Sequence, residues 1–210
     1  MDDVGAQYHR GGGAMAPGPA VPDRVRLPLS FDPDSLKEDL DRFEGEQWVR
    51  HTARQNYQGQ WSILPLRAAA GETHPLRLVN VDPTATHFAD TAWLDRAPYF
   101  RAAIERFQCP LRNVRLMRLA AGSEILSHSD LDLDVESGRA RLHVPITTND
   151  KVEFRVNGRP VALEPGSCWY LKLTDPHEAA NRGDTDRVHL VIDSEVNDWL
   201  LTMLAAGTAA

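Results

Sequence analysis

The stretch ARLHVPITTNDKVEFRVNGRPVAL at residues 140–163 indicates how this chain folds. Apolar residues recur at every second position of its first part, at Leu142, Val144 and Ile146. A period of two is typical of a β-strand with one buried face. Residues 152–156 and 159–163 flank Asn157-Gly158, a pair that favours the type I′ turn of a β-hairpin. This stretch is therefore predicted to be antiparallel sheet.

Further short strands are expected on both sides of this stretch, at residues 24–29, 113–119, 166–173, 177–181 and 187–192. Helices are expected after Asp32-Pro33, which suit an N-cap and first turn, after Pro98, and at 196–204. The fold class is thus mainly β with flanking helices. Many short antiparallel strands joined by polar turns indicate a sandwich or jelly roll.

Composition narrows the functional classes. The chain has 210 residues, of which 42% are hydrophobic and 25% charged, values that suit one globular domain. Residues 1–22 are rich in Gly, Ala and Pro and are expected to be a flexible tail, with the domain covering 23–210. The net charge of -7 argues against a nucleic-acid partner.

No apolar run is long enough to cross a membrane, and no secretory signal is apparent at the N-terminus. Cys109 and Cys168 form no close pair, so a disulfide framework is not expected. A reducing cytoplasm is the expected location, with no membrane partner.

The strongest chemical signal is His128-Ser129-Asp130 followed by His177. Two imidazoles and one carboxylate are the ligands of a 2-His-1-carboxylate facial triad, which holds Fe(II) and leaves coordination positions open. Arg187, ten residues after His177, could grip a carboxylate-bearing cosubstrate through its guanidinium fork. The alternative is that residues 127–130 form only a solvated polar turn.

Two strands repeat an Arg-x-His pattern, Arg141 with His143 and Arg187 with His189. Residues two apart share one face of a strand, so each pair lies on one side. A polar face on a single strand is most often the solvent face. Its repetition on a second apolar strand favours a wet or paired site, because a bare buried charge is costly.

The C-terminal part resembles the aspartyl/asparaginyl β-hydroxylase family of Fe(II)/2-oxoglutarate-dependent dioxygenases, and is also similar to bacterial cis-type proline hydroxylases. The resemblance is dense over residues 113–193 and looser before them. The segments that carry it are Arg115-Leu116-Met117-Arg118-Leu119, His128-Ser129-Asp130, Arg141 to Ile146, Pro165-Gly166-Ser167-Cys168-Trp169-Tyr170, Pro176-His177, Asn181 and Arg187 to Asp193.

The resemblance implies a double-stranded β-helix core of the jelly-roll or cupin type. It implies that His128, Asp130 and His177 bind Fe(II) and that Arg187 holds 2-oxoglutarate, with Arg141 and His143 assisting. Dioxygen would be the second cosubstrate. Vertebrate-type aspartyl hydroxylases of this family lack the metal carboxylate that Asp130 supplies here, so their peptide substrate does not transfer directly.

The expected activity is hydroxylation of an amino acid side chain, free or within a peptide and Asp/Asn- or Pro-like, with release of succinate and CO2. Arg115 and Arg118 are the residues expected to contact substrate, although surface or structural pairing is the commoner role for such arginines. The alternatives are a non-catalytic cupin-like module that binds a small ligand, and an interaction protein in which the triad is accidental. His51, His74 and His87 have no partner pattern and are expected to be ordinary loop histidines.

Overall fold

The structure is a computed structural model that describes residues 21–80 and 82–209. The tail expected at 1–22 lies almost entirely outside the described residues. The helices are α1 (Pro33–Asp41), α2 (Pro75–Val79), α3 (Pro98–Ile104) and α4 (Asp198–Ala206), with 3₁₀ turns η1 (Arg54–Asn56) and η2 (Leu94–Arg96). None of these helices has the length and apolar character that crossing a bilayer requires.

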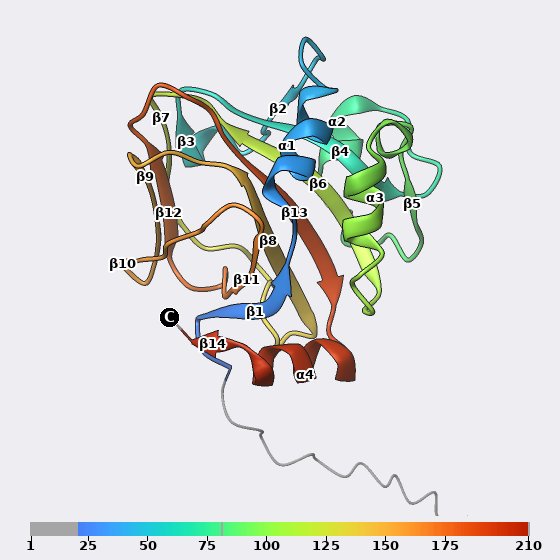
Figure 1. Ribbon diagram of the computed structural model, residues 1–210. Coiled ribbons are helices and arrows are strands. Elements are labelled where there is room, and N and C mark those ends of the chain that lie inside the picture. The colour runs from blue at the N-terminus through green and yellow to red at the C-terminus, as the bar shows by residue number, and fades with distance from the viewer. Residues whose placement is uncertain (1–20, 81, 210) are drawn as a thin grey trace, which may run out of the picture.

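Two antiparallel sheets form the body of the protein (Figure 1). Within the described residues, the larger sheet runs β14-β1-β11-β8-β13-β6-β4-β2, with β5 paired to β4. Its strands are β1 (Arg24–Ser30), β2 (Val49–Arg50), β4 (Trp61–Ala69), β5 (Phe88–Asp90), β6 (Leu111–Leu119), β8 (Arg139–Thr147), β11 (Ser167–Leu171), β13 (Arg187–Glu195) and β14 (Thr208–Ala209). The smaller sheet runs β10-β9-β12-β7-β3. Its strands are β3 (Tyr57–Gln58), β7 (Ser123–His128), β9 (Val152–Val156), β10 (Arg159–Pro160) and β12 (His177–Asn181).

The larger sheet is the middle layer of three, with helices α1 and α3 on one side and the smaller sheet on the other (Figure 1). Leu142, Leu190 and Leu116 point toward the helices and pack with Leu36 and Phe100 in one buried cluster. The opposite faces of the same strands meet the smaller sheet in a second cluster, which includes Met117, Val191 and Phe154. The site described below lies in this second layer, between the two sheets.

The strand pattern read from residues 140–163 is confirmed. Leu142, Val144 and Ile146 are buried together toward the helices, as the period of two requires. Asn157 and Gly158 have φ values of 50° and 69°, and positive φ at both central positions is the signature of a type I′ turn. The second hairpin strand is shorter than expected, since β10 covers only Arg159–Pro160.

Two strands that matter for the site were not predicted. Strand β4 is a nearly continuous buried run, so no period of two marks it, and Pro65 lies inside it beside a register irregularity. Strand β7 carries His128 at its end, in a segment for which the sequence predicted no strand. Both strands depend on partners far away in the sequence, β4 on β6 and β7 on β12.

We predict that Gly166→Ala destabilises the protein far more than Gly122→Ala. Both glycines have positive φ, +77° and +69°, where an L side chain costs about 1–2 kcal/mol. A Cβ at Gly166 would also collide with the carbonyl oxygen of Phe31, whereas nothing lies within 4 Å of a Cβ at Gly122. Gly166→Ala should therefore cost about 3 kcal/mol or more, since overpacking adds about 1–3 kcal/mol. Urea denaturation of both variants measures this, and equal losses would contradict it.

Candidate metal centre

The two histidines of the sequence motif face each other across paired strands. His128 ends β7 and His177 begins β12, and the antiparallel register pairs these residues directly. Their ring centroids lie 4.3 Å apart. Asp130 follows β7 and is held by its backbone N–H, which donates to the carbonyl of Leu173 at 2.8 Å. One ligand atom from each of the three side chains lies within 4.8 Å of the other two, the spacing that a shared metal ion requires.

The same kind of hydrogen bond to a backbone carbonyl orients both imidazole rings. Nδ1 of His128 donates to the carbonyl of Leu126 at 2.7 Å, and Nδ1 of His177 donates to the carbonyl of Asp175 at 3.1 Å. In each case the acceptor lies two residues earlier in the chain. Because Nδ1 carries the proton, Nε2 keeps its lone pair for a metal, as is usual for metal-binding histidines. Burial lowers the pKa of His177 to about 4, which keeps this ring neutral at physiological pH.

The carboxylate of Asp130 has one oxygen bound and one directed toward the histidines. Oδ2 accepts a hydrogen bond from Nη1 of Arg141 at 2.7 Å. Oδ1 lies 3.8 Å from Nε2 of His128. Two neutral imidazole nitrogens and one carboxylate oxygen are the donor set that suits ferrous iron with open coordination positions. The residues present therefore fit such an ion.

Arg187 borders a cavity that Asp130 and His177 also line. Few groups nearby neutralise its positive charge. Its side chain is buried at the start of β13, with 3% of the residue exposed. Nη2 donates to Nδ1 of His189 at 2.9 Å, and the guanidinium lies over the ring of Phe154 at 5.5 Å. Nε has no hydrogen-bond partner among the described residues. Burial lowers the pKa of Arg187 to about 9, so an anion bound here would be strongly favoured.

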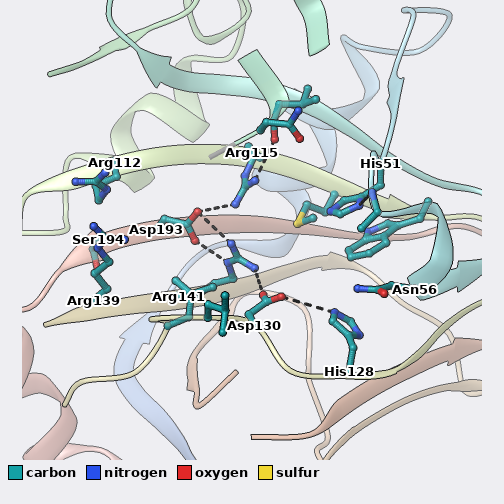
Figure 2. A pocket seen from close by; sticks show the side chains of 17 residues that line it. His51, Asn56, Arg112, Arg115, His128, Asp130, Arg139, Arg141, Asp193 and Ser194 are labelled. Carbon is teal, nitrogen blue, oxygen red and sulfur yellow. Dashed lines mark hydrogen bonds and ion pairs between the residues drawn. The ribbon is translucent and has the colours of Figure 1, made fainter. Parts of the chain in front are cut away.

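Two cavities meet at the cluster of His128 and Asp130. One contains Arg187, His143 and His177 and is walled by apolar side chains: Ile125, Phe154, Leu173, Ala179 and Val191. The second, about 260 Å³ in volume, is shown in Figure 2. Trp61, Met117 and Arg141 line both. Both cavities border one candidate metal position, and the cavity of Arg187, about 30 Å³, is much the smaller of the two.

Three other residues that the sequence predicted for the site border these cavities. His143 borders the Arg187 cavity, and its Nε2 is buried without a partner among the described residues. Arg141 borders both cavities, but its guanidinium is engaged by Asp130 and Asp193. Arg115 lines the second cavity.

Arg118 lies outside this arrangement. Three positions from Arg115 along β6, it points to the opposite face of the sheet, where its guanidinium stacks 4.4 Å from the ring of Trp48. Its Nε donates to Oγ of Ser62 at 3.3 Å. The expectation that Arg118 contacts substrate does not agree with this position, because successive side chains of a strand alternate between faces.

Three residues of the site were missed or undervalued in the sequence. His51 is no ordinary loop histidine, because it stacks on Trp61 with centroids 3.7 Å apart and borders the second cavity. The indole Nε1 of Trp61 is buried without a hydrogen-bond partner in the part of the chain described. Asp193 was noticed only as the end of a motif. Its signal was available, since a carboxylate in the apolar strand 187–193 shares a face with Arg187 and His189.

Comparison with known proteins agrees with this geometry. The sequence profile of the family described as aspartyl/asparaginyl beta-hydroxylase matches residues 32–196. The chain belongs to this family. That match includes the candidate metal cluster, Arg187 and Asp193 but leaves out β1 and all of α4.

This β-hydroxylase family member is similar to an L-proline cis-4-hydroxylase of Rhizobium meliloti (strain 1021), with 28% identity over 173 residues. The aligned region is 80% of this chain and 59% of that relative, so the chain spans about three-fifths of the relative's length.

Solved structures establish the fold of this family member. An oxidoreductase of the 2OG-Fe(II) oxygenase family from Burkholderia pseudomallei superposes with a TM-score of 0.50 at 18% identity, covering 83% of this chain and 86% of that one. A Pseudomonas putida prolyl-4-hydroxylase gives 0.50 at 11% identity, covering 84% and 94%. The two facing antiparallel sheets are thus the double-stranded β-helix expected from the sequence.

We predict that replacing Arg187 by Met leaves the ligand-free family member as stable as before or more stable. The substitution removes a buried cation that no carboxylate within residues 21–80 and 82–209 neutralises, while keeping most of the side-chain volume. Arg24→Met is the matched control, because Arg24 is equally buried but binds Asp23 and the carbonyl of Val156. Its loss should cost about 3 kcal/mol. Chemical denaturation compares the two, and a large loss from Arg187→Met would show that this cation is structural.

Proposed function

We propose that this chain is an Fe(II)- and 2-oxoglutarate-dependent dioxygenase that hydroxylates an amino acid. The observation that carries the proposal is the convergence of His128, Asp130 and His177 within 4.8 Å, beside a buried and poorly neutralised Arg187. A structural cluster of histidines would not need an unpaired guanidinium across the same cavity. Family membership and the relative's activity on proline support the same conclusion.

In this proposal Nε2 of His128, Nε2 of His177 and Oδ1 of Asp130 hold the metal on one face. When bound, ferrous iron supplies the activation of dioxygen that couples decarboxylation of 2-oxoglutarate to hydroxylation of a C–H bond. The balance is one 2-oxoglutarate, one O2 and one C–H substrate giving succinate, CO2 and the alcohol. The chain's own part is to orient both organic molecules and keep water out.

Arg187 would bind the distal carboxylate of 2-oxoglutarate through its guanidinium. The apolar walls around it leave few other groups able to pair with a carboxylate, so the orientation of the cosubstrate is well defined. His143 borders the same cavity, and its unpartnered Nε2 supports the expected assisting role. Arg141 supports the site differently from the sequence expectation, because its donors already bind Asp130 and Asp193.

The second cavity would receive the substrate. It borders His128 and Asp130, and its volume of about 260 Å³ falls just below the range of about 300–1,000 Å³ for drug-sized ligands. Its ionisable wall is dominated by arginines, Arg112, Arg115, Arg139 and Arg141, against Asp130 and Asp193. An excess of positive charge in a small cavity favours a small carboxylate-bearing molecule. A free amino acid, with proline as the first candidate, fits better than a long peptide.

We also propose that residues 23–210 form a single catalytic domain. The family match over 32–196 and the shared helix and sheet layers support this organisation.

The metal-ligand assignment predicts that His177→Ala and Asp130→Ala each abolish succinate release from 2-oxoglutarate in the presence of Fe(II) and ascorbate. Each variant loses one of the three proposed protein ligands. His87→Ala is the control, because His87 is exposed and lies outside the cluster, and it should keep wild-type turnover. Normal turnover by either ligand variant would remove that residue from the proposed centre.

The substrate assignment predicts that small free amino acids stimulate succinate release more than Asp- or Asn-containing peptides do. Mass spectrometry should show a gain of one oxygen in the stimulating compound. Stimulation by peptides alone would refute the size argument. Binding of 2-oxoglutarate with no succinate from any compound tested would instead favour a non-catalytic binding module.

A further inference from the structure

Asp193 is a buried carboxylate that binds two arginines of the site. It lies on β13 with 3% of the residue exposed, on the same face of the strand as Arg187 and His189. Its Oδ1 accepts from Nε of Arg141 at 2.6 Å, and its Oδ2 accepts from Nη2 of Arg141 at 3.2 Å. Oδ2 also accepts from Nη2 of Arg115 at 2.5 Å. Figure 2 shows this carboxylate between the two guanidinium groups.

Sheet pairing brings these groups together. In the larger sheet β13 lies between β8 and β6. Asp193 is in direct register with Arg141 of β8, and Arg115 of β6 pairs with Val191, two residues before Asp193. The register of three adjacent strands therefore fixes the Cα positions of Asp193, Arg141 and Arg115.

Arg141 uses opposite sides of its guanidinium for two different carboxylates. Nε and Nη2 form the edge that contacts Asp193, while Nη1 donates to Oδ2 of Asp130 at 2.7 Å. A guanidinium is planar and rigid, so the two-point contact with Asp193 sets the direction of the third donor. Without that contact, the guanidinium could turn, and Asp130 would lose a fixed partner on Oδ2.

The charges support the same division of roles. Burial by itself would raise the pKa of Asp193, but the positive charges of Arg141 and Arg115 outweigh it and lower the pKa, so the carboxylate stays ionised. If Asp193 were uncharged, Arg141 would lose the charged partner that fixes its guanidinium.

We propose that Asp193 is a positioning residue for the metal centre, acting through Arg141 to hold Oδ2 of Asp130 and leave Oδ1 for the ion. This inference rests on the proposed function, because it assumes that Asp130 is a metal ligand. Asp193 touches neither the metal position nor the proposed cosubstrate residue Arg187. Its effect is on the orientation of a ligand, as outer partners of metal ligands commonly have.

The test is Co²⁺ binding to the purified full chain, followed by visible absorption and by calorimetry. Asp193→Asn keeps the shape of the side chain but loses the charge, and it should weaken Co²⁺ binding about 10- to 100-fold and alter the absorption bands. Glu195→Gln is the matched control. Glu195 lies on the same strand and binds Arg112, but neither residue contacts Asp130 in the structure. It should bind Co²⁺ within twofold of wild type.

A double-mutant cycle shows whether Asp193 acts through Arg141. Arg141→Lys keeps the positive charge but cannot contact both carboxylates with a rigid fork. Combined with Asp193→Asn, it should weaken Co²⁺ binding no more than the stronger single variant does. Additive losses would overturn the proposal. So would a lowered melting temperature of Asp193→Asn with an unchanged Co²⁺ affinity and spectrum, which would make Asp193 merely structural.

If Asp193→Asn does not fold, Arg115→Lys and Arg141→Lys carry the test. Both arginines contact Asp193, but only Arg141 contacts Asp130. Arg141→Lys should weaken Co²⁺ binding and Arg115→Lys should leave it within twofold, whereas equal effects would overturn the proposal. Failure of the proposed function is distinguishable, because the wild-type protein would then bind no Co²⁺ in a His177-dependent manner.

Discussion

A charged group between the two sheets has little access to water, and this constraint explains most of what surrounds the candidate site. Transferring an ion into such a layer is costly unless an opposite charge or several hydrogen bonds replace its water. Asp193 meets the requirement with Arg115 and Arg141. Asp130 meets it in part, with Arg141 on one oxygen. The charges in this layer are thus arranged as connected pairs rather than scattered singly.

Arg187 is the exception to this pairing of opposite charges. It is as buried as Asp193, but no carboxylate of the described chain binds it. Natural proteins keep buried arginines paired because an unpaired one lowers stability. Here the unpaired cation shares a cavity with the candidate metal cluster, an arrangement that suits a site for an anion.

Backbone pairing sets the positions of the candidate metal ligands. The register of β7 and β12 sets His128 opposite His177, and carbonyl groups two residues earlier orient both rings. Backbone hydrogen bonds hold strand positions more tightly than flexible side chains can. Arg141 then restrains Asp130 from the larger sheet. The centre is therefore assembled by both sheets, and movement of one relative to the other would disperse it.

Motif spacing and a family resemblance singled out the four candidate residues His128, Asp130, His177 and Arg187. Local patterns in the sequence determined the hairpin at Asn157-Gly158 and the strand faces of 140–147 and 187–192. These features depend on neighbours in the chain, where periodicity and turn preferences act. The alternation of side chains along residues 115–118 also places Arg115 and Arg118 on opposite faces of the strand, a distinction that the prediction of both as substrate contacts did not make. Only the tertiary structure decided that His51 stacks on Trp61, that β4 and β7 are strands, and that Asp193 binds Arg141 rather than solvent. Those outcomes depend on strand register between distant segments, which local preference does not encode.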